Sequence, residues 1–280
     1  MTPMLAPFTA ALTGTRIEAE YRALSDSMAR VCPTTAVFDA SAYDQRAVAL
    51  ARRLWSDRMV NEYTSTTVFS ALAAQLVEAN ASLDTTAVTL RMAHDELVHA
   101  EVCAKVVVAM GGDVLRMRDP RVVPIARHPG CSPEERAIRN VIFTTCLSEM
   151  NSVAYFIAAL DEMKDPYLRD VTRRLLSDEV LHGSFGFAYL EAWSPWLAAH
   201  EKERASIARY LRYAFAVVER EFARGEHRTL ALSADHLALG VVHPDLASDV
   251  FRNTMENAVV PGLERFAIDG ESAWKMRALA

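Results

Sequence analysis

The five-residue pattern Asp-Glu-apolar-apolar-His occurs twice in the chain, as DELVH at 95–99 and DEVLH at 178–182. Each copy lies in a long segment with helical periodicity, and residues i and i+3 of a helix lie on the same face. The glutamate and the histidine of each copy can therefore reach one point. The sequence predicts two helices that each present a carboxylate and an imidazole on one side, from Glu96 and His99 and from Glu179 and His182.

Helix-start signals and helix breakers divide the chain into long helices. Ser132-Pro133, Asp165-Pro166 and Ser194-Pro195 each place a capping side chain before a first-turn proline. We expect Pro261 to kink or end one of the later helices. The predicted helices cover about 43–80, 84–110, 133–163, 166–192 and 195–224, with shorter pieces near 234–240, 244–267 and 271–278.

A long crossover separates two predicted helical hairpins. Residues 112–132 carry three prolines and have no helical period, whereas short turns join the first helix to the second and the third to the fourth. Two hairpins with one long crossover form a known four-helix-bundle topology. The sequence therefore predicts an all-α chain with a core over about 43–192 and accessory C-terminal helices over about 194–280. We expect one more helix at about 16–30 and a single domain over 1–280.

Two further glutamates lie near the middle of the other two core helices. Glu62 is within NEYTS in the first helix, and Glu149 is within LSEMNS in the third. Their neighbouring turns are mainly small or apolar, which is typical of a core-facing side. Successive glutamates are 34, 53 and 30 residues apart, and the longest gap falls at the crossover. A single Glu-x-x-His is common by chance, but this order, with one Glu or Glu-x-x-His per long helix, is not.

Four carboxylates inside an apolar bundle would be very costly if their charge were not compensated. Two divalent cations would balance the four charges, and two imidazoles would complete the ligand set. Carboxylate-rich sites with one histidine per metal suit iron or manganese better than structural zinc, which favours thiolates. The sequence therefore predicts a di-metal site formed by Glu62, Glu96, His99, Glu149, Glu179 and His182.

This ligand order resembles that of the ferritin-like di-iron carboxylate superfamily, over about 43–192. The resemblance implies a ferritin-like four-helix bundle with additional N- and C-terminal helices, two iron ions or a manganese–iron pair, and O2 as co-substrate. In oxygen-activating members, the acid before each motif glutamate supports a ligand histidine through a hydrogen bond, which implies that role for Asp95 and Asp178. The alternative for each aspartate is a solvated i,i+4 partner of the histidine in its own motif.

Several members of the superfamily fit the chain less well than the oxygenases do. About 88 residues follow the fourth helix, more than a storage subunit requires, and there is no Cys-x-x-Cys for the rubredoxin centre usual in rubrerythrins. The radical-generating subunit of ribonucleotide reductase has a tyrosine where this chain has Cys103. The arylamine N-oxygenases add a third histidine where this chain has Leu175, and the aldehyde-deformylating oxygenases have similar helix spacing in a shorter chain.

The resemblance therefore implies an enzyme, a stand-alone non-haem di-iron oxygenase or oxidase for a small organic substrate. Hydroxylation, N-oxygenation and oxidative carbon–carbon cleavage all stay open. The six metal ligands would be its catalytic residues. Electrons would come from an external reductase or a ferredoxin-type donor, because the chain shows no flavin or iron–sulfur motif. An iron-binding or peroxide-handling protein and a radical-generating subunit are the alternatives.

Charge and cysteine usage narrow the class of partner and the compartment. A net charge of −6 and a pI of about 5.8 give no basic surface for nucleic acid. No apolar run reaches the length of a membrane span. The four cysteines are scattered, and no basic residue precedes Arg16 as a signal peptide would require, so we expect a cytoplasmic protein. The oligomeric state stays open, with a homodimer as one option.

Small residues follow the second motif, at Gly183, Ser184 and Gly186. They would either open space for a substrate beside the metals or allow two helices to pack closely. Close packing is the slightly favoured interpretation.

Overall fold

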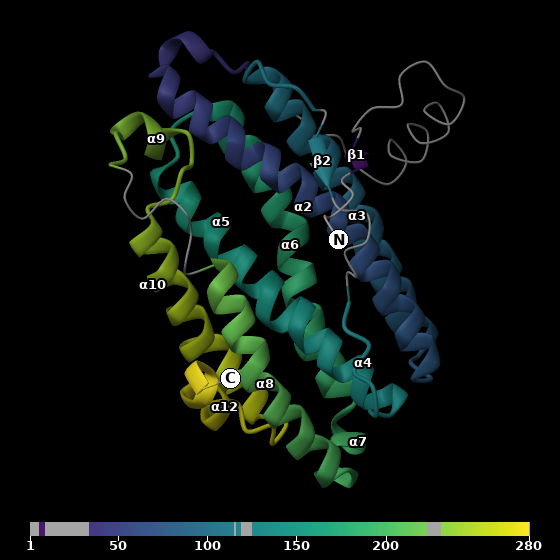
Figure 1. The fold of residues 1–280 in the computed structure, drawn as a ribbon. Coiled ribbons are helices and arrows are strands. Elements are labelled where there is room, and N and C mark those ends of the chain that lie inside the picture. Colours follow the sequence, from purple (N-terminus) through teal and green to yellow (C-terminus); the bar gives the residue numbers. More distant parts are fainter. Residues whose placement is uncertain (1–5, 9–33, 115, 119–124, 223–230, 280) are drawn as a thin grey trace, which may run out of the picture.

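The computed structural model describes residues 6–8, 34–114, 116–118, 125–222 and 231–279, and over these residues the protein is an all-α helical bundle (Figure 1). Four long helical stretches form its core, and their positions confirm the four predicted core helices to within a few residues. They are α2 (Gln45–Glu78), α3 (Leu83–Ala109), the continuous stretch α4 (Pro133–Val141), η2 (Ile142–Glu149) and α5 (Met150–Glu162), and α6 (Pro166–Ala192).

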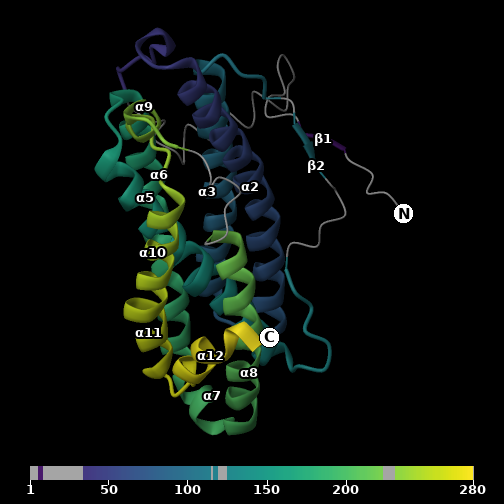
Figure 2. The ribbon, with the colours of Figure 1, turned by 60° about the vertical axis from the view of Figure 1, so that its left-hand side comes forward.

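The core is built from two hairpins, as predicted. α2 packs against α3, and η2 and α5 pack against α6, so that the helices of each hairpin lie side by side in Figures 1 and 2. A short turn joins the helices within each hairpin, and the segment between α3 and α4 crosses from one hairpin to the other. Contacts between α3 and α6 bring the two hairpins together.

Capping side chains define where the core helices begin. A side-chain oxygen accepts a backbone N–H two or three residues ahead at Asp44 (2.7 Å), Ser132 (3.2 Å) and Asp165 (2.9 Å). Pro133 and Pro166 follow two of these caps. A proline in the first turn leaves no N–H unpaired and already has a helical φ, so these starts are strongly specified by the sequence.

The C-terminal part of the chain packs on the second hairpin. Figure 2 shows α10 and α11 running beside the core, and α10 contacts α5 while α12 contacts α8. Its elements are α7 (Ser194–Ala199), α8 (Glu201–Phe222), α9 (Ala234–Ala238), α10 (Pro244–Thr254), η3 (Met255–Val259), α11 (Val260–Glu264), α12 (Gly270–Met276) and η4 (Arg277–Leu279); one further short helix, η1 (Ala40–Ala42), precedes α2.

The single helix predicted over 195–224 is wrong, because the chain breaks at His200. This residue has φ −119° and ψ 67°, outside the helical region. The His200 ring stacks on Trp196 with the centroids 4.2 Å apart, and its Nδ1 donates to the Trp196 carbonyl at 2.8 Å. Arg204 donates to the Leu197 carbonyl, also at 2.8 Å. The two side chains thus satisfy carbonyls that the end of α7 leaves without helical partners.

The predicted break at Pro261 takes the form of a π-helical segment. The helix continues from α10 through η3 into α11, and Pro261 lies in the first turn of α11. Proline has no N–H for an i→i−4 bond. The π segment just before it, in which the Val260 N–H donates to the Met255 carbonyl, absorbs the change in helix geometry. Pro261 therefore alters the helix without ending it.

The sequence predicts no strand, yet the structure has a short antiparallel ladder. β1 (Ala6–Phe8) pairs with β2 (Arg116–Arg118) in the crossover segment. A segment that is not helical needs other partners for its backbone N–H and C=O groups. Here another segment of the same chain supplies them. The predicted helix at about 16–30 lies outside the described residues.

Two apolar clusters fill the core on either side of a polar layer. α2 contributes Trp55 and Met59 to one cluster and Phe69 and Leu72 to the other, with Glu62 between them. α3 and α6 likewise contribute some of their buried residues to one cluster and some to the other. Each of these helices therefore crosses from one apolar cluster to the other through a polar stretch, and these stretches lie at one level of the bundle.

One stretch of helix, Pro133–Glu162, is long and apolar enough to cross a membrane when judged by length and composition alone. By this measure the expectation of no such segment is wrong. The stretch is a core helix of the bundle, and core helices of soluble proteins pass the same test, so the match is weak evidence for a membrane span.

Candidate metal centre

The structure brings all six predicted ligands together in the polar layer between the apolar clusters. They come from four helical stretches: Glu62 from α2, Glu96 and His99 from α3, Glu149 from the end of η2, and Glu179 and His182 from α6. They form two groups whose ligand atoms lie within 4.8 Å of one another. One group is Glu62, Glu96, His99 and Glu179, and the other is Glu149, Glu179 and His182.

The two motif glutamates lie between the two histidines. Glu179 directs one oxygen to His99 Nδ1 at 3.2 Å and the other to His182 Nδ1 at 3.3 Å. Glu96 approaches His182 Nδ1 at 3.1 Å, and Glu62 approaches His99 Nδ1 at 3.6 Å. The imidazole centroids are 5.8 Å apart. Glu179 therefore belongs to both groups, and Glu96 connects the His99 group with the His182 ring.

Buried polar atoms without hydrogen-bond partners show that the cluster suits metal ions. Glu96 Oε1, His99 Nδ1, Glu179 Oε2 and His182 Nδ1 are all buried and make no hydrogen bond among the described residues. Leaving such atoms unpaired in a protein interior is costly. Glu96 Oε1 and Glu179 Oε2 lie 3.1 and 3.3 Å from His182 Nδ1. Carboxylate oxygens and imidazole nitrogens are the donors that iron and manganese accept. The donor set therefore fits two divalent ions.

Burial and mutual charge shift the titration of the cluster. Burial is the largest influence on Glu96 and Glu149, and it raises the pKa of both carboxyls well above the usual range. At the histidines, burial lowers the pKa but contacts with carboxylates outweigh it, so the pKa of His99 rises and that of His182 reaches about 12. The two imidazoles hold the pKa of Glu179 low in turn. Without metal, protons on the imidazoles thus offset the carboxylates, and metal ions would replace these protons.

Each histidine lies beside an aspartate from the other hairpin. His99 Nε2 in α3 donates to Asp178 in α6 at 3.2 Å, and His182 Nε2 in α6 lies 3.6 Å from Asp95 in α3. Both aspartates are largely buried, so the interpretation as solvated partners within one motif does not apply. The contact with Nε2 leaves Nδ1 of each ring facing the cluster, which fixes the ring orientation that a metal ligand needs.

Two arginines extend this arrangement, and the sequence reasoning missed them. Arg91 donates to Asp95 at 2.7 Å, and Arg174 pairs with Asp178 in the same way. Each arginine lies four residues before its aspartate, so the repeated motif is Arg-x-x-x-Asp-Glu-x-x-His and not only its last five positions. The longer repeat was readable in the sequence. We refer to the two chains of contacts, Arg91–Asp95–His182 and Arg174–Asp178–His99, as the relays.

The π-helical segment η2 determines where Glu149 points. Hydroxyls of Thr144, Thr145 and Ser148 donate to backbone carbonyls four or five residues earlier, at 2.8, 2.7 and 3.1 Å. Such bonds satisfy carbonyls whose helical partners are displaced. A π turn inserts an extra residue and rotates the side chains that follow, and π turns are frequent at functional sites. The cluster of hydroxyl residues in TTCLS is the signal that could have indicated it.

The glycines of α6 allow close packing against this segment, which confirms the favoured interpretation. A Cβ atom at Gly186 would collide with the side chains of Thr145 and Cys146 and lie 3.2 Å from the Cys146 backbone nitrogen. A Cβ at Gly183 would lie 3.2 Å from the flexible Met150 sulfur. Neither glycine lines the large cavity described below.

Replacing Gly186 with alanine should therefore destabilise the fold by roughly 1–3 kcal/mol, the usual cost of overpacking a core. Chemical denaturation should show a lower midpoint with an unchanged slope. The exposed neighbour Ser184 offers a matched control, because Ser184→Ala changes no core contact. Equal midpoints for Gly186→Ala and Ser184→Ala would contradict the packing described here.

Cys103 lies beside the cluster at the position that holds a tyrosine in the radical-generating subunits. It is fully buried, and burial together with the charge of Glu62 raises the pKa of its thiol. A neutral buried thiol is a poor metal ligand and a poor nucleophile. Cys103 is thus a packing residue beside the cluster.

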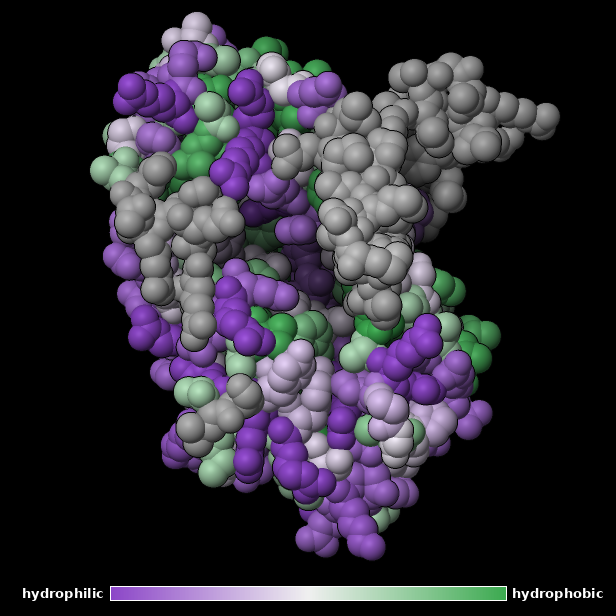
Figure 3. All heavy atoms as spheres, in the orientation of Figure 1, coloured by the Kyte–Doolittle hydropathy of each residue, from purple (hydrophilic) through white to green (hydrophobic). Residues whose placement is uncertain are grey.

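A large cavity reaches the cluster on its carboxylate side. It has a volume of about 790 Å³ and lies between α2, α5, the end of α8 and the segment after α9. Figure 3, drawn in the orientation of Figure 1, shows a recess near the middle of the molecule, and hydrophilic residues lie in it. Its wall includes four ligand carboxylates, from Glu62, Glu96, Glu149 and Glu179, but neither histidine.

The cluster thus has two different sides. Carboxylates face the cavity, and imidazoles face the relays between α3 and α6. This arrangement can hold metal ions at the bottom of a cavity with room for a small molecule. No known protein family, curated protein or solved structure matches this chain, so the geometry of the cluster and its cavity carries the functional argument.

Proposed function

We propose that this protein is a non-haem di-iron oxygenase or oxidase that uses O2 to oxidise a small organic substrate at the carboxylate–histidine cluster. The observation that supports it best is the cavity of about 790 Å³, whose wall contains four of the six ligand side chains. A storage site needs only a path for ions, whereas this volume is within the range of small-molecule sites. Two hairpins around a shared cluster are also the arrangement of ferritin-like di-iron proteins.

The six side chains would hold two iron ions, with a manganese–iron pair as the alternative. His99 and His182 would bind one ion each through Nδ1, and Glu179, which contacts both rings, would be shared between the ions. Glu62 and Glu149 belong to one group each, so they would serve one ion each and not both. When bound, the two ions would supply the electrons that reduce O2.

The remaining tasks fall to groups of this chain. The relays would keep each imidazole in one orientation, and the apolar clusters above and below the polar layer would exclude water. The cavity would admit the substrate on the carboxylate side. Reducing equivalents would come from an external reductase or a ferredoxin-type protein, because the sequence has no motif for a flavin or an iron–sulfur centre.

Stepwise addition of ferrous iron to the metal-free protein should saturate at about two ions per chain, because the donor set forms two groups among the residues that the structure describes. Metal analysis after removal of unbound iron gives the ratio anaerobically. The same titration in air separates the functions, since an oxygenase should keep that ratio while consuming O2. A storage protein would accumulate ferric iron far beyond it.

Two results would assign the protein to a different functional class. Continued iron uptake in air would favour a ferritin-like storage function. A persistent tyrosyl radical in high yield after exposure to O2, detected by electron paramagnetic resonance, would favour a radical-generating subunit. A ratio of one ion or none after anaerobic loading would refute a di-metal centre altogether.

A further inference from the structure

One cation in the wall of the large cavity has no ion-pair partner among the residues that the structure describes. In the proposed function, two divalent cations neutralise the four ligand carboxylates. Arg53 and Asp57 face one another at 3.8 Å. Arg58 is the next cation of the wall, and it makes no ion pair with any residue that the structure describes.

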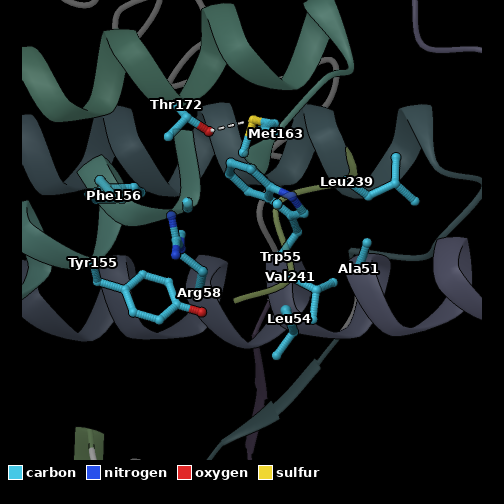
Figure 4. A pocket seen from close by; sticks show the side chains of 12 residues that line it. Ala51, Leu54, Trp55, Arg58, Tyr155, Phe156, Met163, Thr172, Leu239 and Val241 are labelled. Carbon is cyan, nitrogen blue, oxygen red and sulfur yellow. Dashed lines mark hydrogen bonds between the residues drawn. The ribbon is translucent and has the colours of Figure 1, made fainter. Parts of the chain in front are cut away.

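Aromatic rings hold the Arg58 guanidinium in place. Its central carbon lies 4.2 Å from the centroid of the Phe156 ring and 5.1 Å from that of Trp55. Figure 4 shows Arg58 beside Phe156 and Tyr155, at a second, much smaller cavity of about 30 Å³ that shares this part of the wall. Stacking on rings uses the faces of a guanidinium and leaves its N–H edge available for an oxygen pair.

Glu221, the remaining acid of the wall, is not an ion-pair partner of Arg58. Glu221 is an exposed residue at the end of α8; desolvation raises the pKa of its carboxyl, and the neighbouring Arg220 opposes that shift. No contact between Glu221 and Arg58 lies within ion-pair distance in the described part of the chain. A cation in a partly desolvated cavity is costly without an anion, so the missing partner is expected to come from the ligand.

The position of Arg58 limits the size of that ligand. Arg58 precedes Glu62 by four residues on α2, which is about 6 Å along the helix axis. Phe156 follows Glu149 by seven residues on α5, which is roughly 10 Å along that axis. A group bound at Arg58 therefore lies about one to two helical turns from the cluster. A small molecule can span this distance.

We propose that the cavity takes an organic substrate with a carboxylate group, that Arg58 binds this carboxylate, and that the other end of the molecule lies at the cluster. This inference rests on the proposed oxygenase function and names its substrate class. One guanidinium without an ion pair suits the single negative charge of a carboxylate better than the double charge of a phosphate dianion. Arg58 and a carboxylate can form two parallel hydrogen bonds.

Calorimetric titration with matched pairs of probes tests the proposal. Benzoate, 4-phenylbutanoate and octanoate are each compared with the primary amide of the same skeleton, using the iron-loaded protein without O2. At least one acid should bind about tenfold or more tightly than its amide, as expected for a charge-assisted bond to arginine. Arg58→Met keeps the contact with the rings and should reduce that acid to the affinity of its amide.

Two further variants and the metal-free protein complete the test. Arg58→Lys keeps the charge without the planar fork and should retain part of the preference. Arg46→Met, at the exposed start of α2, should retain all of it. An acid that bound the iron directly would lose its affinity in metal-free protein and would not respond to Arg58→Met. The proposal requires that the acid keeps affinity in the metal-free protein and loses its advantage over the amide in Arg58→Met.

Equal affinity for every acid and its amide, or a preference that survives in Arg58→Met, would overturn the assignment of Arg58. Failure of the proposed function gives a different result. Protein that binds no iron but still prefers an acid in an Arg58-dependent way would refute the di-iron oxygenase and leave the carboxylate site in place.

Discussion

Replacing Glu179 with alanine should remove both metal ions from the chain and abolish O2-dependent turnover. Its two oxygens approach the Nδ1 atoms of His99 and His182 at 3.2 and 3.3 Å, so one side chain serves both groups of ligands. Without Glu179, each metal ion would lose one carboxylate ligand. The remaining carboxylates would no longer balance the positive charge of two ions in this buried site. The measurement is iron content after anaerobic loading and gel filtration.

Glu62 and Glu149 provide matched comparisons, because each belongs to one group only. Glu62→Ala and Glu149→Ala should each lose about one ion from a total of about two. Glu179→Gln keeps the shape but removes the charge, and its iron content should resemble that of Glu179→Ala. Retention of both ions by Glu179→Ala would show that this carboxylate is not shared, and the assignment of the two groups would then be wrong.

Asp178→Asn should lower metal affinity or turnover by about 10–100-fold while leaving the fold intact, which is the usual effect of losing the partner of a ligand imidazole. His99 Nε2 donates to Asp178 at 3.2 Å, and an amide in place of the carboxylate weakens this bond without a large change of shape. Iron affinity, measured by competition with a chelator, reports the effect without the need for a substrate.

Two controls separate orientation of the imidazole from a general effect of charge. Asp161→Asn removes an exposed acid from the end of α5 and should leave affinity unchanged. Asp95→Asn alters the equivalent contact with His182, which is longer at 3.6 Å, so its effect should be the smaller of the two. If Asp178→Asn and Asp161→Asn were indistinguishable, Asp178 would not position His99.

The predictable parts of this structure depend on local geometry. Four of the six ligands, Glu96 with His99 and Glu179 with His182, follow from spacing, because positions i and i+3 share a helical face wherever the helix packs. Glu62 and Glu149 follow from the small and apolar residues around them and from the order of the motifs along the chain. The starts of the core helices follow from caps such as Asp165, whose bond to a backbone N–H three residues ahead is also local. These features require no knowledge of how one helix is rotated against another.

The parts that the sequence did not reveal depend on tertiary contacts. Asp178 pairs with a histidine in another helix, and that choice depends on how α3 and α6 are rotated against one another. Arg91 and Arg174 resemble ordinary i,i+4 partners on a helix surface until the buried aspartates are seen. The break at His200 follows from a ring that stacks on Trp196 and takes a backbone carbonyl, in a segment whose periodicity continues on both sides.

The crossed contacts of the relays have the symmetry of a two-subunit interface within a single chain. Residue His99 meets Asp178 and His182 meets Asp95, as in a homodimer in which i contacts j and j contacts i. Neither hairpin contains a complete site, since each lends its aspartate to the other's histidine. Every residue of one relay thus has an equivalent residue in the other relay of the same chain. The same substitution can be made at either position, and the two variants can be compared in an otherwise identical molecule.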